Sequence, residues 1–169
     1  MTTQLTMERS NSSMQLTRAA DYAIRVMIHL AAFESGRRVS LPAMVAATGA
    51  PHSFLSKVLQ ALTRAQLITS RRGPAGGFEI SARGRHASMR EVLEAIDGPM
   101  CLNVCLNELR SCARKDWCPA HPVWVKAQAA ILEVLGSAMI ADLAAEMRNP
   151  SEVARQTCAG DRGSRPAPR

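Results

Sequence analysis

Four side chains that could bind a metal lie close together in the second half of the chain. They are Cys105, Cys112, Cys118 and His121. Three thiolates and one imidazole are the ligand types of iron–sulfur clusters and of tetrahedral zinc sites. The alternative interpretation is a reduced loop that is merely rich in cysteine. The spacing favours a metal centre in this segment.

The chain that leads to this segment is strongly basic. Between residues 36 and 85, eight Lys and Arg residues stand against Glu79 alone, so this block carries a net charge of +7. The whole chain also carries +7, so the excess positive charge lies in this block. A surface that binds a polyanion concentrates its charge, whereas a solubilising surface spreads it. The charge distribution predicts a partner that is a nucleic acid.

Helical periodicity predicts a helix-turn-helix within and just before this block. Residues 17–33 carry an apolar stripe at helical spacing. A short helix is expected from the N-cap Ser40 to residues 48–49, and a third helix from 53 to about 66. Two short helices joined by a tight turn that contains glycine form a helix-turn-helix.

The third helix has two distinct faces. Its apolar residues recur at the spacing of a core-facing stripe. The opposite face carries side chains suited to phosphate and base-edge contacts: Ser53, Lys57, Gln60 and Arg64. An ordinary solvated helix face would look similar, so this face indicates DNA binding only together with its neighbours.

Residues 67–81 predict a β-hairpin that follows the third helix. Two β-prone runs flank a turn of glycines and Pro74, and Arg71 and Arg72 come just before that turn. Arginine on a thin wing suits a narrow minor groove, where the negative potential is high. An ordinary surface hairpin explains the turn but not the paired arginines. We therefore predict a mainly α fold with a winged helix-turn-helix that binds double-stranded DNA. The predicted DNA contacts are Ser53, Lys57, Gln60, Arg64, Arg71, Arg72 and Pro74.

Two further helices are expected after the wing. A capping box from Ser88 to Glu91 predicts a helix to residue 96. Residues 123–147, after the cysteines, predict one long apolar helix that bends near Gly136. A small winged domain cannot bury so long a helix, and palindromic operators require dimers, so we expect a partner subunit to cover it.

Composition limits the class of protein. No apolar run approaches the ~20 residues that a membrane span needs, and no leader peptide opens the chain, so a soluble, cytoplasmic, nucleoid-associated protein is expected. In that compartment five cysteines favour metal or redox chemistry over structural disulfides. The chain has no Cys-x-x-Cys pair and no constellation typical of catalysis, so we do not expect an enzyme.

The chain resembles the Rrf family of bacterial winged-helix transcriptional regulators, which includes the iron–sulfur regulator IscR and the nitric-oxide sensor NsrR. The resemblance covers about residues 14–147. It rests on MQLTRAADYA from Met14, RGPAGGF from Arg72, EAIDG from Glu94 and CPAHPVW from Cys118.

The resemblance implies a homodimer whose three loop cysteines hold a [2Fe–2S] or [4Fe–4S] cluster; Cys105, Cys112 and Cys118 match those positions. The fourth ligand differs among members. His121 matches the histidine of the IscR type, and Asp21 matches the carboxylate that the NsrR type supplies from the other subunit. We favour His121.

Several residues leave this ligand set open. Asp21 has Arg18 and Arg25 at i−3 and i+4, which could simply pair with it. The segment between the first two ligand cysteines is one residue longer than the commonest pattern. Cys101 is an extra thiol that could serve as a ligand instead, whereas Cys158 is interpreted as incidental.

These features divide the chain into a disordered lead (1–13), a winged helix-turn-helix domain (14–85), a connecting helix (86–100), a cysteine-rich cluster-binding loop (101–121), a dimerisation helix region (122–148) and a disordered tail (149–169). The lead could equally be an upstream start before a working start at Met14. The predicted function is a transcriptional regulator, a repressor, whose operator affinity is controlled by an iron–sulfur cluster that senses redox state, nitric oxide or iron supply. The alternative is a winged-helix regulator with a structural zinc or a thiol switch in the same loop.

Overall fold

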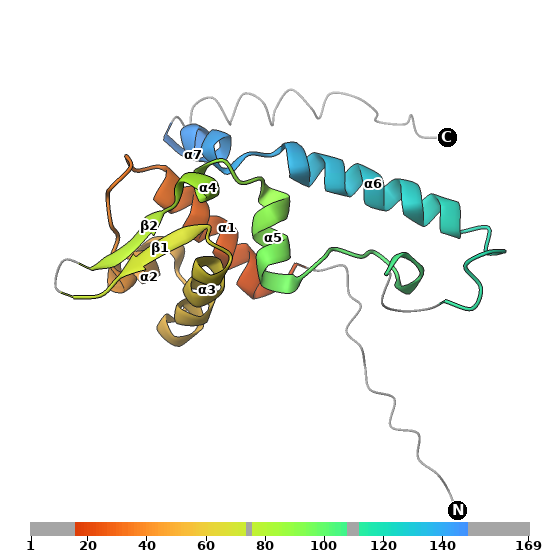
Figure 1. The fold of residues 1–169 in the computed structure, drawn as a ribbon, viewed down its shortest axis with the longest axis horizontal. Helices are drawn as coiled ribbons and strands as arrows, with labels where there is room; N and C mark the ends of the chain where they lie inside the picture. Colours follow the sequence, from red (N-terminus) through yellow and green to blue (C-terminus); the bar gives the residue numbers. More distant parts are fainter. Residues whose placement is uncertain (1–15, 74–75, 108–111, 149–169) are drawn as a thin grey trace, which may run out of the picture.

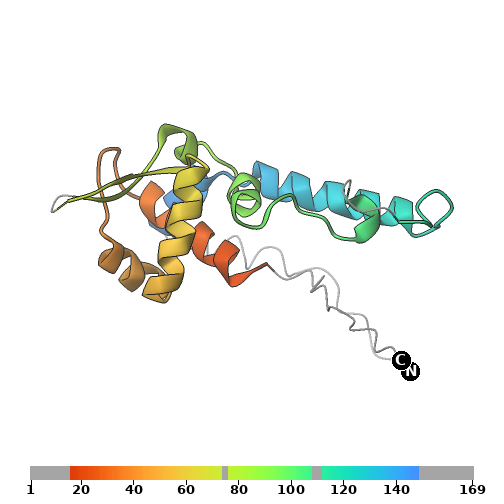
Figure 2. The ribbon, with the colours of Figure 1, turned by 60° about the horizontal axis from the view of Figure 1, so that its bottom comes forward.

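The computed structural model describes residues 16–73, 76–107 and 112–148. Its elements are α1 (Arg18–Ala31), α2 (Leu41–Thr48), α3 (His52–Arg64), β1 (Ile68–Arg71), β2 (Gly77–Ile80), α4 (Ala82–Arg85), α5 (Met89–Asp97), the 3₁₀ turn η1 (Val104–Leu106), α6 (His121–Ser137) and α7 (Ile140–Arg148). In both ribbon views α6 extends away from the end of the molecule that holds α2, α3 and the hairpin (Figures 1 and 2). None of the described helices is long and apolar enough to cross a membrane.

Helix α1 lies at the centre of the core. The Thr17 hydroxyl caps its start by accepting a hydrogen bond from the Ala20 N–H (3.1 Å). The helix packs against α3, α5 and α7. Its buried face is wider than the stripe expected from the sequence and comprises Ala20, Ala23, Ile24, Val26, Met27, Leu30 and Ala31.

Helices α2 and α3 form the predicted helix-turn-helix. Ser40 caps α2 through its side chain. Gly49 ends α2 in the left-handed conformation (φ 68°), which glycine adopts without steric cost, and the chain then turns into α3. The side chains predicted to face the core from α3 are all buried, namely Leu55, Val58, Leu59 and Leu62. This part of the prediction is confirmed.

The wing is a two-stranded antiparallel hairpin tied to the loop before α2. Ile68 pairs with Ile80 and Arg71 with Gly77. Val39 extends the pairing, because its N–H and carbonyl both bond to Phe78 at 2.9 Å. Glu79 accepts a hydrogen bond from the Gly36 N–H (2.7 Å) and lies 3.6 Å from the Arg38 guanidinium. The base of the wing is therefore fixed to the α1–α2 loop.

The short helix α4 was not expected from the sequence. Ser81 caps it by accepting from the Gly84 N–H at 2.8 Å. The helix lies so close to the chain before β1 that a Cβ on Gly84 would come within 1.9 Å of the Leu67 carbonyl oxygen. Only glycine allows this approach.

We expect Gly84→Ala to lower the free energy of unfolding by about 1–3 kcal/mol, because α4 must move away from Leu67 to make room. Urea unfolding followed by circular dichroism measures the change. Gly136→Ala is the matched control, since a Cβ there meets no atom within 4 Å. Alanine in that helix stabilises it by about 0.5–1 kcal/mol relative to glycine. Equal stabilities of Gly84→Ala and wild type would contradict the close packing.

The expectation of one continuous helix over 123–147 is wrong. Helix α6 begins at His121, runs through Gly136 without a break and ends at Ser137, where Ala138 becomes extended (ψ 97°). Helix α7 then returns to the core, with Ile140 and Ala144 fully buried. The break arises because the junction between the two helices pairs with the chain before α5. Helix α6, in contrast to α7, has no fully buried residue.

Candidate DNA-binding surface and cysteine loop

The polar face of α3 is open to solvent. All four side chains predicted to contact DNA from this helix are exposed: Ser53, Lys57, Gln60 and Arg64. They lie opposite the buried leucines, which pack α3 against α1 and α5. The helix thus presents one cationic and hydrogen-bonding surface, as the sequence predicted for a helix that enters a groove of DNA.

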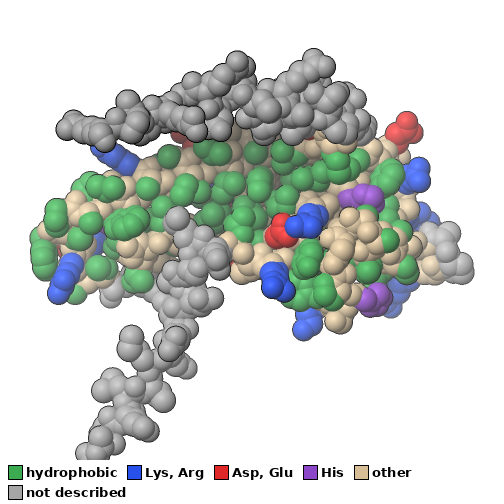
Figure 3. Space-filling view, turned by 180° about the vertical axis from the view of Figure 1, so that it is seen from behind, with side chains coloured by type: hydrophobic (Ala, Val, Ile, Leu, Met, Phe, Trp, Pro, Cys, Tyr) green, Lys and Arg blue, Asp and Glu red, His purple; other side chains and the backbone are tan. Residues whose placement is uncertain are grey.

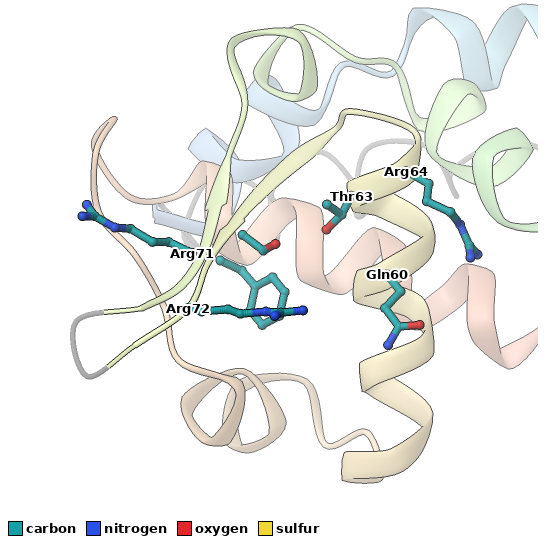
Figure 4. A pocket seen from close by; sticks show the side chains of 7 residues that line it. Gln60, Thr63, Arg64, Arg71 and Arg72 are labelled. Atoms are coloured by element: carbon teal, nitrogen blue, oxygen red, sulfur yellow. The ribbon is translucent and has the colours of Figure 1, made fainter.

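A cleft of about 440 Å³ lies between α3 and the wing (Figure 4). Six of its seven lining residues have polar or cationic side chains, and the lining consists of Gln60, Thr63, Arg64, Ser70, Arg71, Arg72 and Phe78. In Figure 4 the Arg72 side chain extends into this cleft toward Gln60, whereas Arg71 points to the other side of the hairpin. The two arginines therefore have different surroundings.

The different directions of Arg71 and Arg72 follow from strand geometry. Successive side chains of a strand point to opposite faces, so Ser70 and Arg71 lie on opposite sides of β1. Arg72, the residue just after the strand, continues this alternation. The sequence pattern treats Arg71 and Arg72 as a pair and does not indicate Thr63, Ser70 or Phe78 as contacts. Alternation along β1, and the position of Thr63 three residues after Gln60, were the available signals. Pro74, also named as a contact, lies outside the described residues.

The described part of the cysteine loop is anchored to α6. The Leu102 N–H donates to the Gln128 side-chain oxygen (3.1 Å). The Asn103 side chain caps the turn η1, which carries Cys105, by accepting from the Val104 N–H at 2.7 Å. Cys105, Cys112 and Cys118 are half-buried free thiols, and Cys101 is an exposed one whose sulfur lies 3.8 Å from the Leu106 carbonyl.

His121 sits where the loop enters α6. It is the first residue of the helix, and its backbone N–H donates to the Cys118 carbonyl (3.1 Å). Its Nδ1 atom is buried and has no hydrogen-bond partner among the residues that the structure describes. A buried imidazole nitrogen without a partner costs free energy, and a metal ligand bond is one way to satisfy it. This start of α6 also lacks a side-chain cap.

The ligand types fit a metal centre, but the ligand side chains do not lie together in the structure. In the stretches 16–73, 76–107 and 112–148, no three Cys, His, Asp or Glu side chains lie close enough together to hold a metal ion. The carboxylate of Asp21 forms an ion pair with Arg25 (2.9 Å), which is the alternative to metal ligation that its sequence neighbours suggested. His121 is thus the candidate fourth ligand with an unmet bonding capacity.

Comparisons with known sequences agree on one family. A family model described as "Rrf2: Iron-dependent Transcriptional regulator" matches residues 16–146. A protein of Mycobacterium tuberculosis strain H37Rv, named "Putative HTH-type transcriptional regulator Rv1287", is 34% identical over 137 residues, 78% of this chain and 81% of that protein. Protein rrf2 of Nitratidesulfovibrio vulgaris is 26% identical over 145 residues, 86% of this chain and 95% of that protein.

Solved structures share the fold. CymR, described as the global cysteine regulator of B. subtilis, superposes with a TM-score of 0.63 at 22% identity, over 79% of this chain and 98% of that chain. IscR of T. potens gives a TM-score of 0.61 at 22% identity, over 86% and 93% of the two chains. The predicted fold class is confirmed, and the family consists of regulators rather than enzymes. The chain belongs to the Rrf2 family of DNA-binding transcriptional regulators.

Proposed function

We propose that this Rrf2-family regulator is a homodimeric repressor whose affinity for an operator is controlled by an iron–sulfur cluster in the cysteine loop. The observation that carries the proposal is the buried Nδ1 of His121, which lacks a partner among the described residues, in the same segment of the chain as three free thiols. These donors belong to the segment that leads into α6, and the cationic face of α3 lies toward the other end of the molecule. Such a protein acts in the bacterial cytoplasm, on the DNA of the nucleoid.

In this proposal α3 enters the major groove and the wing follows the adjacent minor groove. Ser53, Lys57 and Gln60 face the DNA from α3, with Arg64 at its last turn. Arg72 approaches the DNA from the wing, across the cleft from Gln60. The proposal is supported by the exposure of all these side chains and by the net charge of the block that contains them.

We expect Arg72→Ala to weaken operator binding more than Arg71→Ala, because only Arg72 points into the cleft between wing and helix. A lost base contact costs ~1–3 kcal/mol, or roughly 5- to 150-fold in affinity. Gel-shift titrations at several salt concentrations measure both variants. Arg71→Ala is a matched control, since it removes the same charge from the same hairpin. If both Lys57→Ala and Arg72→Ala left operator binding unchanged, the polar face of α3 and the wing would not be the DNA-binding surface.

Homodimerisation is proposed to occur through α6. This helix of 17 residues is about 26 Å long and buries none of its side chains in its own subunit. Val123 and Val134 are 64% and 66% exposed. Figure 3 shows hydrophobic side chains spread over the side of the molecule that carries α6, into the middle of the molecule. An apolar surface of this kind on a small protein is typical of an interface between subunits.

The cluster ligands are proposed to be Cys105, Cys112 and Cys118, with His121 as the fourth ligand in preference to Asp21 of the other subunit or Cys101. The cluster would supply a redox-active centre when bound. The residues of this chain connect that centre to α6, because His121 begins the helix and Gln128 holds Leu102. Ligation of the thiols by a cluster would therefore affect how well ordered the loop is and how α6 packs.

A structural zinc in the same ligands is the second candidate, since three thiolates and one imidazole also suit a closed tetrahedral zinc site. The decisive experiment is to purify the protein without oxygen after expression with iron supplied. Visible absorption and metal analysis are then measured. A brown protein with iron and acid-labile sulfide supports the cluster. A colourless protein with about one zinc per chain supports the alternative.

A further inference from the structure

The junction between α6 and α7 is paired with the start of α5. The Met89 N–H donates to the Ala138 carbonyl (2.8 Å), and the Ile140 N–H donates to the Ala87 carbonyl (3.0 Å). Ser88 and Met139 lie opposite each other in this short antiparallel pair. Because the pair joins the end of α6 to the first turn of α5, a displacement of α6 acts first on that turn.

Two side chains in series, Glu91 and Arg83, link the first turn of α5 to the end of α3. Glu91 closes the capping box of α5, where one of its oxygens accepts from the Ser88 N–H (2.8 Å). Its other oxygen lies 3.8 Å from the guanidinium of Arg83. Arg83 in turn donates to the carbonyl of Ala65, the C-cap residue of α3. Carbonyls at a helix C-terminus lack partners within the helix, so a guanidinium there stabilises the last turn.

We propose that Arg83 is a positioning residue that couples the α6–α7 junction to the C-terminal end of α3. Movement at residues 138–140 shifts residues 87–89, alters the contact of Glu91 with Arg83, and changes the support of the last turn of α3. That turn carries Arg64, one of the residues that line the cleft. The proposal rests on the proposed function, in which the packing of α6 controls operator binding.

The Arg83–Glu91 contact has the properties of a contact that can be switched. Its side chains are 57% and 44% exposed, so the ion pair alone contributes little free energy. It connects the first turn of α5 to the last turn of α3, two helices that also pack directly against each other. Arg83 is also cationic and exposed, so the experiment must separate positioning from a direct phosphate contact.

The first experiment measures operator affinity for Glu91→Gln, Arg83→Gln and the double variant. Glutamine preserves the capping box and removes only the charge that faces Arg83. Removing a negative charge would by itself raise affinity for DNA, whereas loss of positioning lowers it. We expect each single variant to bind the operator roughly threefold to tenfold more weakly than wild type, and the double variant to bind no more weakly than the single ones. The salt slope, which is the change of log affinity with log salt concentration, should stay unchanged.

Matched controls lie on the same helix. Arg90 and Glu94 form an i,i+4 ion pair at 3.0 Å on α5. Glu94→Gln and Arg90→Gln change the net charge as Glu91→Gln and Arg83→Gln do, without touching the end of α3. Their operator affinities should show only the effect of the charge itself, a small rise for Glu94→Gln and a small fall for Arg90→Gln.

The second experiment needs no operator. Hydrogen exchange is measured by mass spectrometry for the segment 62–67, where the Gln66 and Leu67 N–H groups bond to the Thr63 and Leu62 carbonyls (both 3.0 Å). Met89→Pro removes the hydrogen bond to Ala138, and proline is tolerated at the first position of a helix. Ser88 already has the extended conformation (φ −80°, ψ 160°) that proline requires before it. Met89→Ala removes the same side chain but keeps the N–H.

We expect Arg83→Gln and Met89→Pro to raise exchange in this segment, and Met89→Ala to leave it unchanged. Unchanged exchange with Arg83→Gln or Met89→Pro overturns the coupling. If Arg83→Gln reduces the salt slope by about one and Glu91→Gln does not weaken binding, Arg83 is a phosphate contact and the proposal is wrong. Failure of the proposed function is seen separately, as a wild-type protein that binds no operator but still shows these exchange differences.

Discussion

Serine in place of Cys105, Cys112 or Cys118 is expected to bleach the anaerobically purified protein and to remove its iron and acid-labile sulfide. Each of these thiols is free and half-buried, in the loop that leads into α6. A serine hydroxyl is a much poorer ligand for iron than a thiolate, so loss of any one of three thiolates leaves too few soft ligands. Visible absorption and iron analysis, made on freshly purified protein, give the result directly.

The other cysteines and His121 supply the controls. Cys158→Ser, outside the described residues, should keep the colour, and Cys101→Ser should matter little unless the longer first spacing has moved the ligand set. His121→Ala should still assemble a cluster but lose it faster in air or nitric oxide, because a nitrogen ligand would be missing. Full colour in all three serine variants at the loop positions would contradict the proposed ligands.

The elements that could be predicted from the sequence are those that local signals specify. The apolar spacing of Leu55, Val58, Leu59 and Leu62 identified the buried face of α3, and the capping box at Ser88 and Glu91 identified the start of α5. Both signals act over one or two helical turns. Because these signals locate the buried face of α3, they also predict the helix-turn-helix and the exposed face opposite the leucines.

The break between α6 and α7 could not be predicted in the same way. Residues 137–139 contain no proline or glycine, and Gly136, the expected bend, is helical. What ends α6 is the pairing of Ala138 and Ile140 with residues 87–89, far away along the chain. The burial of Ile140 then favours a second helix over a longer first one.

The candidate metal centre was predictable only as a set of donors. Residue types and spacing identified three thiols and an imidazole, and the structure adds that the imidazole nitrogen of His121 lacks a partner. A loop without regular secondary structure has no periodicity from which side-chain positions follow. The cleft beside Arg72 was missed for a different reason, since it depends on how the hairpin lies against α3.

Introducing a charge on the exposed apolar face of α6 is expected to give monomers that bind the operator poorly. Val134 is the sharpest site, because it is 66% exposed in the single subunit, whereas Leu135 packs against its own core and would also destabilise the fold. Val134→Asp, and likewise Ile131→Asp, would place an unpaired carboxylate in the proposed interface. The cost of several kcal/mol corresponds to a dissociation constant raised by roughly two orders of magnitude or more.

Ala129→Asp is the matched control for this change in assembly. Ala129 is exposed and lies on α6 five residues from Val134, which is about 140° around the helix. The Ala129→Asp variant adds the same charge to the same helix on another face, so it should remain dimeric.

Light scattering at micromolar concentration measures the oligomeric state of each variant, and gel shifts on a palindromic operator measure the consequence for binding. Because two linked recognition helices bind such an operator far more tightly than one, Val134→Asp should lose both properties together. A wild-type protein that is monomeric at this concentration, or a dimeric Val134→Asp, would show that α6 does not form the interface.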